Sequence, residues 1–156
     1  MKTQQCRCLR TSLLFAAAAS AANLAFATGP ALRVAYPSPD LPGLPYSAAV
    51  KAGHTIYVSG VTGHEPGSRK PVQGGVQAEA EQALRHIEEI LRTAGAAMTD
   101  VAKCTVLLAD IEGFPALNAA YRKFFPEQPP ARSTIVVPAL PDKALVEIEC
   151  NAEVGD

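Results

Sequence analysis

The clearest hydrophobic pattern in the chain is helical and lies in its middle. Apolar side chains stand at positions 76, 80, 83, 84, 87, 90, 91 and 94, with mostly polar and charged residues between them. A spacing of three and four places one apolar stripe along an amphipathic helix. Gly95 follows at the point where a left-handed C-cap favours glycine. The pattern therefore predicts a helix over residues 76–94.

A second, shorter helical stripe follows residue 113. Residues 110–113 form the helix entry, and Pro115 suits the first turn. Pro126 ends the pattern, because proline cannot continue a helix. The apolar positions of this stripe are Phe114, Leu117, Tyr121 and Phe124 or Phe125.

Short runs of β-branched and alternating apolar residues predict strands at 47–50, 55–58, 101–109, 133–137 and 145–153. The first two strands form a hairpin, and the second of them ends at Ser59-Gly60. A proline-rich arm precedes the hairpin, and residues 33–36 of this arm could form an extra strand at the edge of the sheet. The order ββαβαββ is typical of an α+β two-layer sandwich. We expect two helices packed on one face of a single mixed sheet, with the other face uncovered.

The last strand shows which side chains belong to each face. Val146, Ile148 and Cys150 alternate with Glu147 and Glu149, so the apolar set is expected under the helices and the acidic set on the open face. Arg132 stands at the start of the preceding strand, in PPARSTIVV. If that strand runs alongside in matching phase, Arg132 also lies on the open face, beside Glu147.

The chain begins with a basic start, an alanine-rich apolar run and Ala25-Phe26-Ala27, the small-x-small pattern at which signal peptidase cleaves. We expect residues 1–27 to be a signal peptide and residues 28–156 one domain, periplasmic or secreted, with a lipid-anchored product as the lesser alternative. Without Lys2, Arg7 and Arg10, the 14 basic residues fall to 11 against 15 acidic ones, a net charge of −4. This balance argues against nucleic acid as a partner, because phosphate contacts need a concentrated basic face.

Cysteine and histidine usage gives two further expectations. Cleavage leaves Cys104 and Cys150 inside predicted strands, and we favour two buried thiols over a disulfide, because nothing in the sequence shows that these strands are neighbours. A metal site is not expected, because His54, His64 and His86 fall on a hairpin, a loop and a solvated helix face without ligand spacing.

Five segments follow one another as they do in the reactive intermediate deaminase family, the RidA or YjgF type. They are PYSAAVKAG, IYVSG, VAKCTVLLADIEGFPALNAAYRKFF, PPARSTIVV and LPDKALVEIECNA. The chain resembles this family over about residues 33–154. The resemblance implies a chorismate-mutase-like fold and a homotrimer with ligand clefts between subunits. It also implies hydrolysis of enamines and imines, such as 2-aminoacrylate and 2-iminobutyrate, to 2-oxo acids and ammonia, with no metal or organic cofactor.

The resemblance also implies roles for individual residues. Arg132 becomes the clamp for the substrate carboxylate, and Glu147 handles protons or orients water. The residues that line the ligand are Tyr46, Gly60, Asn118 and Thr134. Thr134 stands where many relatives have cysteine, and VTGHEP follows Gly60 where relatives usually carry a QIP-type sequence.

These residue types suit imine hydrolysis. A guanidinium fork holds a carboxylate by two parallel hydrogen bonds, and a nearby carboxylate accepts a proton from water and returns it to departing ammonia. Structural interpretations of these residues are also open. Arg132 and Glu147 could form an ion pair with each other, Tyr46 could pack at the edge of the core, and Asn118 could hydrogen-bond to the backbone. The alternative function is a non-catalytic trimeric binder of small carboxylates, and a holdase-type chaperone is a third possibility.

Overall fold

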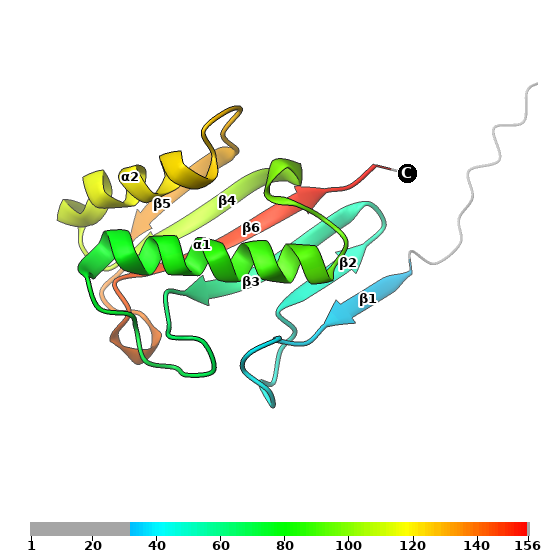
Figure 1. Cartoon of the computed structure of the whole chain (residues 1–156), viewed down its shortest axis with the longest axis horizontal. Coiled ribbons are helices and arrows are strands. Elements are labelled where there is room, and N and C mark those ends of the chain that lie inside the picture. The colour runs from blue at the N-terminus through cyan, green and yellow to red at the C-terminus, as the bar shows by residue number, and fades with distance from the viewer. Residues whose placement is uncertain (1–31, 156) are drawn as a thin grey trace, which may run out of the picture.

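The fold is described by a computed structural model over residues 32–155 (Figure 1). The predicted signal peptide, residues 1–27, lies outside these residues. Two helices, α1 (Gly75–Thr93) and α2 (Phe114–Phe124), lie on one face of a single sheet. The strands are β1 (Arg33–Tyr36), β2 (Ala49–Ala52), β3 (Thr55–Thr62), β4 (Val101–Leu108), β5 (Ala131–Val136) and β6 (Val146–Glu153). Short 3-10 turns cover Met98–Asp100, Ile111–Gly113 and Pro141–Lys143.

The sheet is mixed, and its strand order is β1-β2-β3-β6-β4-β5. Only the β4–β5 pair is parallel among the described strands; the others are antiparallel. The parallel pair follows from the β4–α2–β5 crossover, which returns the chain to the same end of the sheet. The predicted α+β sandwich with two helices on one face is confirmed, and the extra edge strand exists as β1.

The core lies between the helices and the sheet. On β6, the alternation expected from the sequence is observed: Val146, Ile148 and Ala152 are fully buried, and Glu147 is only half-buried. The α1 stripe faces this layer with Ala80, Ala83, Leu84, Ile87, Ile90 and Leu91. β6 is thus held between β3 and β4 and under α1, which gives Glu147 a rigid support.

Two strand bounds differ from the sequence prediction in ways that affect the site. β3 does not end at Ser59-Gly60 but continues to Thr62, and its register against β6 shifts between Val58 and Val61. A bulge absorbs the extra residue and lets the strand pass through glycine. β5 begins at Ala131, two residues earlier than predicted, so Arg132 lies inside a paired strand.

The expectation of two free thiols is wrong. Cys104 and Cys150 are directly opposite each other on β4 and β6 and form a disulfide with an S–S distance of 2.03 Å. The sequence could not show this, because the two strands are separated along the chain by α2 and β5 and become neighbours only in the assembled sheet.

Reduction of this disulfide is expected to lower the free energy of unfolding by about 2–4 kcal/mol, because the bridge closes a loop of sequence separation 46. Urea denaturation with and without dithiothreitol measures the difference. A Cys104→Ala/Cys150→Ala variant is the control, since the midpoint of its urea denaturation should be the same with and without dithiothreitol. The thiols are titrated in denatured, unreduced protein that lacks residues 1–27, and with them Cys6 and Cys8. Two free thiols in that protein would contradict the bridge.

Candidate active site

A cavity of about 100 Å³ opens beside the β3 bulge and the start of β6. Tyr46, Gly60 and Glu147 all line it. A space of this size holds a few water molecules or one small organic acid. The cavity therefore brings together three of the predicted site residues.

Glu147 is the ionisable group on the sheet side of this cavity. Its carboxylate has no hydrogen bond or ion pair within residues 32–155. Burial, followed by the nearby Glu149 carboxylate, raises the pKa of Glu147. Gly60 lies so close that a Cβ there would run into the Glu147 carboxylate. Glu147 is therefore an unpaired carboxyl group with a pKa moved toward neutrality, held beside a glycine that leaves it room.

Arg132 lies in a second hollow at the other edge of the sheet, which Asn118, Tyr121 and Arg122 also line. The Arg132 Nη2 donates a hydrogen bond of 2.6 Å to the Asn118 Oδ1. The Cζ of the guanidinium lies 4.6 Å from the centroid of the Tyr121 ring and 5.4 Å from the centroid of the Phe114 ring. These contacts fix the guanidinium plane and leave most of its N–H groups without an acceptor among residues 32–155. No carboxylate of the described residues pairs with Arg132.

Tyr121 carries a second signal in this hollow. Its hydroxyl is buried and has no hydrogen-bond partner within residues 32–155. Burial raises its pKa to about 12, so the hydroxyl stays protonated and keeps its donor. Buried polar groups are almost always hydrogen-bonded, so the Tyr121 hydroxyl is a donor available to a further group in this hollow.

The predicted convergence of Arg132 and Glu147 on the open face is wrong for one chain. Arg132 pairs with Cys104, whose side chain is buried under the helices, whereas Glu147 pairs with Leu107 and faces the other way. β4 lies between β5 and β6. The two side chains therefore project from opposite faces of the sheet, and an intrachain Arg132–Glu147 ion pair is absent from the described structure.

The remaining predicted residues fall with one group or the other. Asn118 accepts its hydrogen bond from Arg132. A hydrogen bond from its side chain to the backbone, the alternative interpretation, is not observed within residues 32–155. Thr134 lies on the same face as Arg132, two residues along β5 and opposite the buried Val106. Tyr46 is not a core residue, because 55% of its surface is exposed at the cavity rim.

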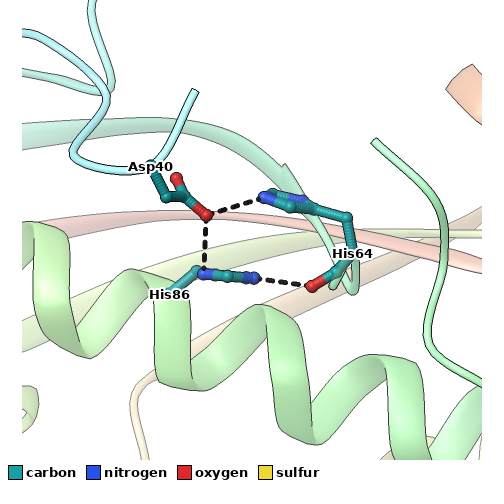
Figure 2. A group of neighbouring side chains, drawn as sticks. All are labelled: Asp40, His64 and His86. Atoms are coloured by element: carbon teal, nitrogen blue, oxygen red, sulfur yellow. Dashed lines mark hydrogen bonds and ion pairs between the residues drawn. The ribbon is translucent and has the colours of Figure 1, made fainter. Parts of the chain in front are cut away.

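Sequence reasoning missed a cluster on the helix side of the first cavity. His86 does not lie on a solvated helix face: its side chain is only 12% exposed and its ring stacks on His64 with centroids 4.2 Å apart. Asp40, from the proline-rich arm, reaches both rings (Figure 2). One indication of this cluster is present in the sequence: the VTGHEP segment, which contains His64, differs from the QIP-type sequence of relatives.

Two helices cover a six-stranded mixed sheet, and Arg132 and Glu147 lie in separate hollows. These features define a small α+β domain with two candidate sites at its surface. A family model described as endoribonuclease L-PSP matches residues 39–154. The chain belongs to this family, the RidA/YjgF family, and adopts its chorismate-mutase-like fold.

Relatives and solved structures agree with this assignment. The chain is 50% identical over 111 residues to a 2-iminobutanoate/2-iminopropanoate deaminase of Capra hircus. It is 48% identical over 111 residues to the protein of the same name from Homo sapiens. Each alignment covers 71% of this chain and 81% of the relative. The structure of RidA from an Antarctic Psychrobacter matches with a TM-score of 0.69 and 37% identity, over 74% of this chain and 94% of that one. The Escherichia coli YjgF gene product matches with a TM-score of 0.68 and 32% identity, over 76% and 92%.

Proposed function

We propose that the protein hydrolyses 2-imino acids and their enamine tautomers, of the 2-iminobutanoate and 2-aminoacrylate type, to 2-oxo acids and ammonia. The observation that carries this is a fixed guanidinium with no carboxylate partner in the described chain, together with a half-buried, unpaired carboxyl group. The names of the relatives at about 50% identity support the same reaction. No organic cofactor is needed, because free imines already react with water.

The two hollows would form one site in an assembly. We propose a homotrimer in which the Arg132 hollow of one subunit meets the Glu147 cavity of its neighbour. The opposite orientation of the two side chains and the unsatisfied Tyr121 hydroxyl support this. So do Tyr57 and Ile135, 50% and 49% exposed, which add apolar surface to the open sheet face.

The chemistry follows from these groups. Arg132 binds the substrate carboxylate through charge-assisted hydrogen bonds, and Asn118 holds the guanidinium in place. Ionised Glu147 accepts a proton from water as the water oxygen bonds to the carbon of the protonated imine, which gives a neutral tetrahedral amino alcohol. Glu147 returns this proton to the nitrogen, the C–N bond breaks, and ammonia leaves as the hydroxyl proton passes to Glu147 and the C=O bond forms. One imine and one water thus give one 2-oxo acid and one ammonia.

An oxidase-coupled assay tests the function. An amino-acid oxidase generates 2-iminobutanoate, semicarbazide traps it, and the protein is expected to lower trapping while 2-oxobutanoate accumulates faster. If a 2-oxo acid binds but trapping does not change, the protein is a carboxylate binder and the deaminase proposal is wrong.

Gly60→Ala is expected to lower kcat/KM by about 10-fold or more, because the new methyl group displaces the Glu147 carboxylate. The free energy of unfolding should change by less than about 1 kcal/mol, since a flexible side chain can move aside. The same assay and urea denaturation measure both. A Gly60→Ala/Glu147→Gln variant is the control: it should be no worse than Glu147→Gln alone, and multiplied losses would show that Gly60 acts by another route.

We further propose that the protein acts outside the cytoplasm, in the periplasm or the surrounding medium. The export pattern of residues 1–27 and the disulfide, which persists in oxidising compartments, support this. No helix within residues 32–155 combines the length and apolar character needed to cross a membrane.

A further inference from the structure

Asp40, His64 and His86 meet at the cavity wall from three separate segments: the arm, the loop after β3, and α1 (Figure 2). The Asp40 Oδ2 lies 3.2 Å from the His64 Nε2 and 3.5 Å from the His86 Nδ1. One ligand atom from each residue lies within 4.8 Å of the other two. The side chains are 23%, 9% and 12% exposed, respectively, so the cluster is largely shielded from bulk water.

The hydrogen bonds fix the tautomer of His86. Its Nε2 lies 2.9 Å from the His64 carbonyl oxygen, and a carbonyl only accepts, so Nε2 carries the hydrogen. The Gln82 amide lies 3.1 Å from the same nitrogen, but its oxygen and nitrogen are interchangeable by rotation, so the carbonyl decides. In a neutral His86 ring, Nδ1 is therefore unprotonated, and it lies 3.5 Å from the Asp40 Oδ2.

Three potential ligand groups thus lie close together: the Asp40 carboxylate, a ring nitrogen of His64 and the unprotonated Nδ1 of His86. The two rings are stacked, with 13° between their planes. Because the lone pair of an imidazole nitrogen lies in the plane of its ring, one ring turns about its Cβ–Cγ bond when both nitrogens bind the same ion.

The outer contacts match those of metal-binding histidines. Such a histidine donates its second N–H to a carbonyl, a carboxylate or another fixed acceptor. His86 does so to the His64 carbonyl, and the His64 Nδ1 lies 3.4 Å from the Thr62 Oγ1. In a tetrahedral zinc site with bonds of 2.0–2.1 Å, ligand atoms lie about 3.3 Å apart. The two Asp40 spacings are already close to that value.

We propose that Asp40, His64 and His86 bind one divalent transition cation of the zinc class, with a fourth position open to the cavity. Two imidazoles and one carboxylate favour Zn²⁺, Co²⁺ or Ni²⁺ over Ca²⁺ or Mg²⁺, which prefer oxygen-only shells. Bound metal ties the arm to α1 and to the end of β3. It thereby fixes the wall of the cavity that Glu147 also lines.

Untagged protein, dialysed against chelator, is titrated with Zn²⁺ by calorimetry and with Co²⁺ by visible absorption. We expect one ion per chain, a Zn²⁺ dissociation constant of about 1 µM or lower, and the intense visible bands of tetrahedral cobalt. His64→Gln and Asp40→Asn should each weaken Zn²⁺ binding by at least about 100-fold. His54→Gln, which removes the histidine outside the cluster, is the matched control and should bind as wild type does.

Millimolar or absent Zn²⁺ binding by the wild-type protein overturns the proposal, as does an equal loss in His54→Gln. Asp40→Asn keeps the shape of the side chain, so its circular dichroism should match wild type and its binding isolates the charge. Metal binding is read directly in these titrations. The result therefore stands whether or not the imine assay succeeds.

Discussion

Arg132→Ala is expected to lower kcat/KM for 2-iminobutanoate by about 1,000-fold or more, because it removes the fork that binds and orients the substrate carboxylate. The fold should survive, since the side chain is only partly buried at a sheet edge and pairs with no carboxylate of residues 32–155. The oxidase-coupled assay measures the loss. Arg132→Lys should restore only part of it, because an ammonium group cannot make two parallel bonds in a fixed plane.

Arg92→Ala is the matched control for this variant. Arg92 lies in the last turn of α1, where its exposed side chain pairs with the neighbouring Glu89 and lines neither hollow. Its removal should leave kcat/KM within about twofold of wild type. Arg132→Ala with more than half of wild-type activity would show that the carboxylate binds elsewhere.

Glu147→Gln is expected to lower kcat by about 10²- to 10⁴-fold, with little change in KM, because the amide keeps the shape but cannot accept the proton from water. Wild-type activity should fall as the pH drops through the Glu147 pKa, because only the ionised carboxyl group is a base. Burial and Glu149 raise that pKa, so the acid limb should lie above the ordinary glutamate range. Steady-state kinetics against pH, with buffers in which the coupling oxidase stays in excess, give both quantities.

Glu149→Gln tests the electrostatic part separately. Removing the like charge lowers the pKa of Glu147, so the acid limb should move to lower pH while the rate on the plateau stays nearly unchanged. A plateau loss as large as that of Glu147→Gln would identify Glu149 as a base and contradict the assignment.

The helices, the strands and the two faces of β6 could be predicted from the sequence because their patterns are local. The α1 stripe and the alternation along β6 depend on periods of 3.6 and 2, which the residues display directly. The face on which Arg132 lies could not be predicted, because it depends on strand order. β4 inserts between β5 and β6, and the register that pairs Arg132 with Cys104 turns the guanidinium toward α2.

The same limit explains the disulfide and the histidine cluster. Cys104 and Cys150 are 46 residues apart in sequence and meet only through the β4–β6 pair. His64 and His86 follow no ligand spacing along the chain, and Asp40 comes from an arm whose path has no periodic pattern. Such contacts between distant segments are set by topology, which a single sequence does not display.

The central claim is that Arg132 of one subunit and Glu147 of its neighbour act on one substrate. Subunits carrying Arg132→Ala and subunits carrying Glu147→Gln are unfolded together in equal amounts under conditions that keep the disulfide, refolded, and assayed with 2-iminobutanoate. In a closed ring with one such interface per subunit, random mixing leaves about one quarter of the sites with both groups intact, so about one quarter of wild-type activity should return. Mixtures that stay as inactive as either parent, although mixed oligomers have formed, would contradict a site shared between subunits.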